Sequence, residues 1–401
     1  MTRTLYAGAS IIDGTGAEPA ASDLVVEDGR IVEIGTGLDA DDRVDLDGTS
    51  LLPGLFDCHT HVVVSSIDTM RLLQTPFSYR FFQAAHNLEA TLRIGITTVR
   101  DAGGADLGVK QAVEDGIVNG PRMQISLSMI SQTGGHGDGW MPSGDTINAL
   151  LPQHPGVPET LVDGPDEMRR TVRELIRLGA DVIKVATSGG VLSPRDKPTH
   201  AHLRPAELEV LVEEATAAGI YVMAHAQAAP GIKNAIRAGI RSIDHGIYLD
   251  DEAIALMLER GTWLVPTLVA PRGVIDAADA GASIPEASVA KARDVVETHR
   301  ASFARAVAAG VKVAMGTDSG VTPHGNNLRE LALMVEGGMT PMQAIVATTR
   351  SAAELMGLDE ELGTLEPGKR ADLVVVDGDP LDFGTLAERV TAVYKDGVQV
   401  I

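Results

Sequence analysis

The stretch LFDCHTHVVV at residues 55–64 places two histidines, His59 and His61, one residue apart inside an apolar run. Side chains alternate between the two faces of a β-strand, so residues at i and i+2 point to the same side. If this run is a strand, both imidazoles therefore enter one small volume. The alternative is two unrelated histidines, one packed and one solvated, and only the rest of the chain distinguishes the two interpretations.

Short apolar runs recur between residues 53 and 357, and several are separated by segments with a helical period. The eight runs are GLFDCHTHVVV (54–64), GITTVRDAG (95–103), RMQISLSMI (122–130), DVIKVATSG (181–189), IYVMAHA (220–226), RSIDHG (241–246), TWLVPTL (262–268) and VKVAMGTDSG (311–320). Near-continuous apolar strands alternating with helices indicate a parallel sheet buried on both faces. Eight units over roughly 300 residues predict an α/β fold, a (β/α)8 TIM barrel at 53–357. An open doubly wound sheet would need a glycine fingerprint after its first strand, and DCHTHVVV is not one.

The two ends of the chain differ from this central part. Both consist of short alternating runs with turns, and EDGR at 27–30 is an Asp-Gly hairpin signal. We therefore expect residues 1–52 and 358–401 to form one composite β-sandwich domain.

The composition limits the classes of function. The chain has 401 residues, 44% of them apolar, and a net charge of −22, which argues against nucleic acid as a partner because phosphate binding needs a basic surface. Its one cysteine excludes an intrachain disulfide, which suits a reducing compartment. No apolar run reaches membrane-spanning length, and no signal peptide is recognisable. We expect a soluble, cytoplasmic protein without a membrane partner.

Polar side chains at the carboxyl ends of the runs test the barrel interpretation, because barrel enzymes place their chemistry there. The candidates come from five of the eight runs: His59, His61, Lys184, His225, His245 and Asp318. Imidazoles with a carboxylate suit zinc, manganese, iron or cobalt better than magnesium or calcium. Each histidine alone is explicable as a core residue, but their coincidence at the strand ends favours a metal site.

Lys184 needs a separate explanation, because an unpaired buried ammonium group is strongly destabilising. One alternative is a pair with a carboxylate such as Asp181. The other is reaction with CO₂ to a carbamate, an anionic two-oxygen group that can bridge two cations. Beside a histidine cluster we prefer the carbamate.

The ordered motifs of the chain resemble the amidohydrolase superfamily, in particular its branch of Xaa-Pro dipeptidase-like and imidazolonepropionase-like enzymes with a binuclear metal centre. The resemblance covers essentially the whole chain. It rests on PGLFDCHTH (53–61), GITTVRDAGG (95–104), QTGGHGD (132–138), VIKVATSGG (182–190), VMAHA (222–226), DHG (244–246), GTDSG (316–320) and LGTLEPGKRADLVVVDGDP (362–380).

The resemblance implies two divalent metal ions, zinc above all, and assigns them six side chains. These are His59, His61 and Asp318 at the more buried ion, His225 and His245 at the second, and N6-carboxylysine at Lys184 as the bridge. It also implies the terminal β-sandwich and a homo-oligomer. Cys58 points away from the His59–His61 face, so we expect a packed thiol rather than a ligand.

Substrate-binding residues are expected in the loops. In peptidase-like relatives the histidine of QTGGHGD helps to bind the substrate carboxylate, which implies this role for His136. Those relatives commonly have a tyrosine two residues after the strand-five histidine, where this chain has Gln227, and the difference weakens the case for a dipeptide substrate. His324 either lines the pocket or has a structural role.

These features predict a metal-dependent amidohydrolase that cleaves a C–N bond of a small substrate, such as a dipeptide or N-acyl amino acid. A metal-bridging hydroxide would attack the carbonyl, with Asp318 as the general base. The alternative within enzymes is a single-metal cyclic-amide hydrolase of the imidazolonepropionase kind with an unmodified Lys184. A remote alternative from another class is an inactive oligomeric scaffold.

Overall fold

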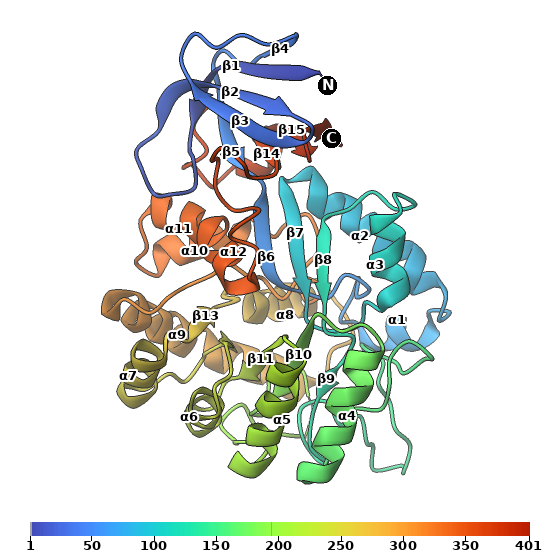
Figure 1. Ribbon diagram of the computed structural model, residues 1–401. Helices are drawn as coiled ribbons and strands as arrows, with labels where there is room; N and C mark the ends of the chain where they lie inside the picture. Colours follow the sequence, from blue (N-terminus) through green and yellow to red (C-terminus); the bar gives the residue numbers. More distant parts are fainter. Residues whose placement is uncertain (1, 194) are drawn as a thin grey trace.

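Both ends of the chain meet in one sheet at one end of the molecule (Figure 1). The structure is a computed structural model that describes residues 2–193 and 195–401, so Met1, the first residue of the predicted terminal domain, lies outside it. The strands of this eight-stranded sheet are β1 (Arg3–Ile11), β2 (Ala20–Glu27), β3 (Arg30–Gly35), β4 (Asp42–Asp45), β5 (Thr49–Pro53), β14 (Leu373–Asp377), β15 (Val390–Lys395) and β16 (Val398–Gln399). Their order is β16-β15-β14-β5-β1-β2-β3, and β4 also pairs with β1. Whether this sheet folds over into the two layers of a sandwich stays a prediction.

The Asp-Gly turn predicted at EDGR is confirmed. It joins β2 to β3, with Glu27 opposite Arg30 in the antiparallel register. Asp28 and Gly29 have φ values of +51° and +76°, as a two-residue turn with positive φ at both positions requires. Side-chain packing also joins the two ends of the chain. The rings of Tyr6 in β1 and Tyr394 in β15 pack edge to face, with centroids 5.1 Å apart.

The central part contains two parallel sheets surrounded by helices (Figure 1). The first has three strands, β6 (Leu55–Thr60), β7 (Ile96–Asp101) and β8 (Arg122–Ile125). The second has five, β9 (Met129–Ile130), β10 (Val182–Ala186), β11 (Tyr221–Ala226), β12 (Ser242–His245) and β13 (Trp263–Val265). Seven of the eight predicted runs therefore contain strands, and RMQISLSMI contains both β8 and β9.

The eighth run, residues 311–320, forms isolated bridges instead of a continuous strand. Val313 pairs with Leu264 of β13, and Ser319 pairs with Thr60 of β6. This segment therefore contacts an edge of each parallel sheet. On the other side, the N–H of Asp181 donates to the carbonyl of Ile125 at the end of β8. These contacts join the two parallel sheets on both sides.

Helices lie between most of the parallel strands of the central part, as the helical period of the intervening segments predicts. Helix α5 covers the segment that begins PAELEV: Pro205 occupies its first turn, the Glu207 side chain accepts from the N–H of Arg204, and Leu208 and Leu211 are buried. The helices of the described residues are α1 (Thr69–Gln74), α2 (Tyr79–Arg93), α3 (Leu107–Glu114), α4 (Pro165–Arg177), α5 (Pro205–Ala217), α6 (Ala229–Ala238), α7 (Asp251–Arg260), α8 (Val269–Asp279), α9 (Glu286–Ala309), α10 (Arg329–Glu336), α11 (Pro341–Ala347) and α12 (Arg350–Met356), with a short 3₁₀ turn η1 (Leu386–Arg389). Within the described ranges, every helix is too short or too polar to cross a membrane.

Candidate metal centre

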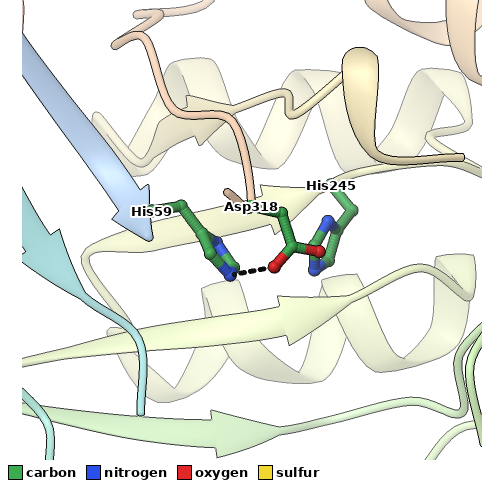
Figure 2. A group of neighbouring side chains, drawn as sticks. All are labelled: His59, His245 and Asp318. Carbon is green, nitrogen blue, oxygen red and sulfur yellow. Dashed lines mark ion pairs between the residues drawn. The ribbon is translucent and has the colours of Figure 1, made fainter. Parts of the chain in front are cut away.

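Three side chains from distant parts of the chain converge at the carboxyl ends of the parallel strands (Figure 2). They are His59 from β6, His245 from β12 and Asp318 from the eighth run, and one potential ligand atom of each lies within 4.8 Å of the others. The Nε2 atoms of His59 and His61 lie 3.4 and 3.2 Å from Oδ1 of Asp318. The two histidines of the opening motif therefore approach the same carboxylate.

The remaining predicted histidines adjoin this group. The rings of His225 and His245 pack edge to face with centroids 4.6 Å apart, and those of His59 and His245 lie 5.1 Å apart. The parallel register places Ala226, next to His225, opposite His245, so the ends of β11 and β12 are aligned. The structure therefore brings together all four predicted histidines and Asp318.

Each of the four histidines has one ring nitrogen close to another protein group. The four contacts are His59 Nδ1 to Asp244 Oδ2 at 2.8 Å, His61 Nδ1 to Gly103 O at 2.8 Å, His225 Nε2 to Gly189 O at 3.2 Å and His245 Nδ1 to Thr267 Oγ1 at 2.7 Å. Second partners of this kind orient metal-binding imidazoles in proteins. The other ring nitrogens are Nε2 of His59 and His61, which face Asp318, together with Nε2 of His245 and Nδ1 of His225.

The charge states also fit a metal site. Burial lowers the pKa of both His225 and His245 well below the usual value of an imidazole, which favours the neutral form with a free lone pair. Burial alone would raise the pKa of Asp318, but the His59 and His61 imidazoles outweigh it and hold that pKa well below its ordinary range. A carboxylate beside the neutral imidazoles of His225 and His245 is a donor set that suits zinc and related divalent ions.

Lys184 is almost fully buried, and its amine donates to Oδ2 of Asp244 at 3.0 Å. The partner suggested from the sequence, Asp181, is wrong, because Asp181 instead accepts from Lys110 at 2.7 Å. The reason is the strand alternation, which turns residue 181 away from the interior that Lys184 occupies. Burial lowers the pKa of Lys184, while the Asp244 carboxylate opposes that shift.

Asp244 and Arg100 are two buried charged residues beside Lys184 that sequence reasoning missed. Arg100 is fully buried and donates from Nε to the carbonyl of Cys58 and from a terminal nitrogen to Oδ1 of Asp244 at 3.3 Å. Burial alone would raise the pKa of Asp244, but Lys184 and Arg100 outweigh it and keep the carboxyl ionised. The one available signal was the motif DHG, in which an acidic residue precedes a candidate ligand.

The predicted substrate residues lie at different places around this centre. The ring of His136 stacks on that of His225, with centroids 4.1 Å apart and planes 16° apart, and its Nδ1 lies 2.8 Å from the Ser193 hydroxyl. Gln227 is buried near the end of β11, and among the described residues its Oε1 has no hydrogen-bond partner. His324 Nε2 lies 3.0 Å from the carbonyl of Val64, so it ties the loop after the eighth run to the loop after β6.

Cys58 is buried, as expected from the strand alternation. It packs among Phe56, Trp263 and Met356, on the side of β6 away from the histidine cluster. Burial raises the pKa of its thiol to about 12, so the thiol is protonated at neutral pH. A protonated, enclosed thiol is not a metal ligand.

Comparison with known proteins identifies the family of this chain. The model of the amidohydrolase family matches residues 50–400. Ochratoxinase from Aspergillus niger is 36% identical over 98% of this chain and 85% of its own length, and imidazolonepropionase from Rhizorhabdus wittichii is 28% identical over 88% of this chain and 87% of its own length. The crystal structure of a Xaa-Pro dipeptidase with methionine bound in its active site superposes with a TM-score of 0.89 at 33% identity, covering 99% of both chains.

Proposed function

Because the chain belongs to the amidohydrolase family and is a metal-dependent hydrolase of carbon–nitrogen bonds, we propose that it cleaves the amide bond of a dipeptide or an N-acyl amino acid. The observation that carries this proposal is the convergence of His59, His61 and His245 on Asp318. We further infer that the two parallel sheets and the eighth run close into a (β/α)8 barrel at residues 53–357. Residues 1–52 and 358–401 would then form a separate β-sandwich.

Two divalent ions, with zinc as the first candidate, would be held by the side chains that the resemblance assigns. They are His59, His61 and Asp318 for one ion and His225 and His245 for the other, with carboxylated Lys184 between them. When bound, such ions lower the pKa of water to near neutrality and polarise a carbonyl oxygen. Burial of His59, His225 and His245 supports this assignment, because it shields their ring nitrogens from bulk water.

The side chains of this chain then supply proton transfer and orientation. Asp318 would accept a proton from the attacking water and deliver it to the leaving nitrogen, since its carboxylate contacts both His59 and His61. His136 would bind a substrate carboxylate, because its stacking on His225 places it beside the centre. The unsatisfied Gln227 amide would hydrogen-bond the substrate next to it.

A second candidate is a cyclic-amide hydrolase with one metal ion. The contact that favours it is the pair between Lys184 and Asp244, which accounts for an unmodified lysine without a carbamate. Imidazolonepropionase is among the relatives, and it matches most of the chain. In this alternative the ion would be held near His59, His245 and Asp318.

Metal content and substrate choice together test these proposals. Protein purified without added metal or chelator should contain close to two zinc-like ions per chain by elemental analysis. It should hydrolyse members of a panel of dipeptides and N-acyl amino acids, and Asp318→Asn should retain the fold but lose turnover. One ion per chain with activity on cyclic amides alone would favour the second candidate. Loaded protein that cleaves neither class would refute both.

The resemblance also implies a homo-oligomer, which we include in the proposal. Light scattering coupled to size-exclusion chromatography gives the mass directly, and a mass of one 42.0 kDa chain would exclude it.

A further inference from the structure

Thr267, just beyond β13, has a backbone conformation that its residue type rarely adopts. Its φ is +51°, in the left-handed region, where a β-branched side chain is a genuine outlier. The residue is fully buried, and its Oγ1 lies 2.7 Å from Nδ1 of His245. Strained residues persist where the surrounding structure holds them, and they gather at functional sites. The contact between Thr267 and His245 therefore needs a functional explanation.

Glu330 of α10 holds this turn from behind. Its side chain is fully buried, and its two carboxyl oxygens accept hydrogen bonds from the N–H groups of Leu268 and Val269 at 2.7 and 2.8 Å. Leu268 follows Thr267 directly and is the N-cap of α8, which begins at Val269. The carboxyl group of Glu330 thus holds the backbone that follows the strained residue. The reaction proposed above does not require this contact.

His245 itself is held at its backbone as well as at its ring. Its φ is +74°, and its carbonyl oxygen accepts a hydrogen bond from Nε2 of His299 in α9 at 2.9 Å. With the backbone fixed in this way, the remaining freedom of His245 is the orientation and protonation of its imidazole. The Thr267 hydroxyl is the group that contacts the ring at Nδ1.

We propose that Thr267, clamped by Glu330, is a positioning residue that selects Nε2 of His245 as the metal-binding nitrogen. A neutral imidazole carries one proton, so an Nδ1–H that donates to the Thr267 hydroxyl leaves the lone pair on Nε2. The strained backbone of Thr267 is what aims its hydroxyl at the ring. This inference rests on the proposed function, because it concerns a ligand of the proposed metal centre.

The consequence is a measurable loss of metal affinity when the hydroxyl is removed. Loss of an outer partner of a metal-binding histidine typically weakens metal binding by about 10- to 100-fold. Thr267→Val removes the hydroxyl at nearly constant volume and should weaken zinc binding to that extent. Thr267→Ser keeps the hydroxyl and should retain zinc as wild type does.

Zinc release to a chromophoric chelator measures this effect independently of turnover. Wild type, Thr267→Val and Thr267→Ser are loaded with zinc, and both the number of ions released and their apparent dissociation constants are determined. Thr98→Val is the matched control, because Thr98 is also buried and, among the described residues, its Oγ1 has no hydrogen-bond partner. One ion of the Thr267→Val protein should leave about 10- to 100-fold more readily, whereas the control should match wild type.

Two outcomes overturn the inference: Thr267→Val holds zinc as tightly as Thr98→Val, or Thr267→Ser loses as much affinity as Thr267→Val. If Thr267→Val does not fold, Thr267→Gly takes its place, since glycine adopts positive φ without strain and also lacks the hydroxyl. A wild-type protein that binds no zinc would instead refute the proposed metal centre, so the two failures are distinguishable.

Discussion

His299 should make the protein sensitive to acid, and the structure indicates by how much. Its side chain is 2% exposed in α9, and its Nε2 lies 2.9 Å from the His245 carbonyl, which can only accept. Nε2 therefore carries the proton of the neutral ring. Among the described residues, Nδ1 has no hydrogen-bond partner, so a second proton there would create a buried unpaired charge. Burial accordingly lowers the pKa of His299 to about 4.

The sign and size of the effect follow from the two pKa values. In the unfolded chain the imidazole takes up its proton near pH 6.5, but in the folded protein only near pH 4. The unfolded state therefore binds more protons in this interval, and stability falls as the pH falls. A difference of between two and three in pKa corresponds to about 3 kcal/mol, of which about 2 kcal/mol is lost by pH 5 and most of the remainder by pH 4.

His299→Gln tests this reasoning, because glutamine can still donate to the His245 carbonyl but does not titrate. Urea unfolding of wild type and variant, both freed of metal by a chelator, gives the free energy of unfolding at pH 7, 5 and 4. Between pH 7 and pH 4 the variant should lose about 3 kcal/mol less than wild type. His86→Gln, at an exposed histidine of α2, controls for the substitution itself. Parallel pH curves for wild type and His299→Gln would refute the reasoning.

Three further predictions concern the site. Lys184→Ala should lose the second metal ion and most activity, with partial rescue by short carboxylic acids; full activity would exclude a bridging carbamate. His136→Ala should raise KM for carboxylate-bearing substrates more than for neutral amides. Gly190→Ala should have the same effect, because the new Cβ would lie 2.2 Å from Cε1 of His136 and displace its ring. Equal effects on both substrate classes would show that His136 does not recognise the substrate carboxylate. Cys58 should not react with a thiol reagent until the protein is unfolded in urea, since it is enclosed and its pKa is about 12; rapid reaction of the native protein would contradict its burial.

The sequence by itself determined the elements and the residue types of the site. Alternation along β6 places His59 and His61 on one side and Cys58 on the other, because a strand has a period of two. The Asp-Gly turn at Asp28 and the first turn of α5 at Pro205 follow equally local rules. Such features depend on neighbours within a few positions, and a pattern read along the chain contains that information.

Only the tertiary structure decided which buried charges meet. Lys184 and Asp244 are sixty positions apart, and nothing in the local pattern distinguishes Asp244 from the nearer Asp181 as the partner. The same holds for Glu330, which caps the turn after Thr267 from a helix about sixty residues away. The packing of the parallel strands against their helices brings these groups into contact. A buried charged side chain then pairs with the oppositely charged or hydrogen-bonding group that lies beside it in the core. The orientation of each imidazole in the proposed metal centre depends on its contacts in the folded chain, and for that reason only the tertiary structure gave it.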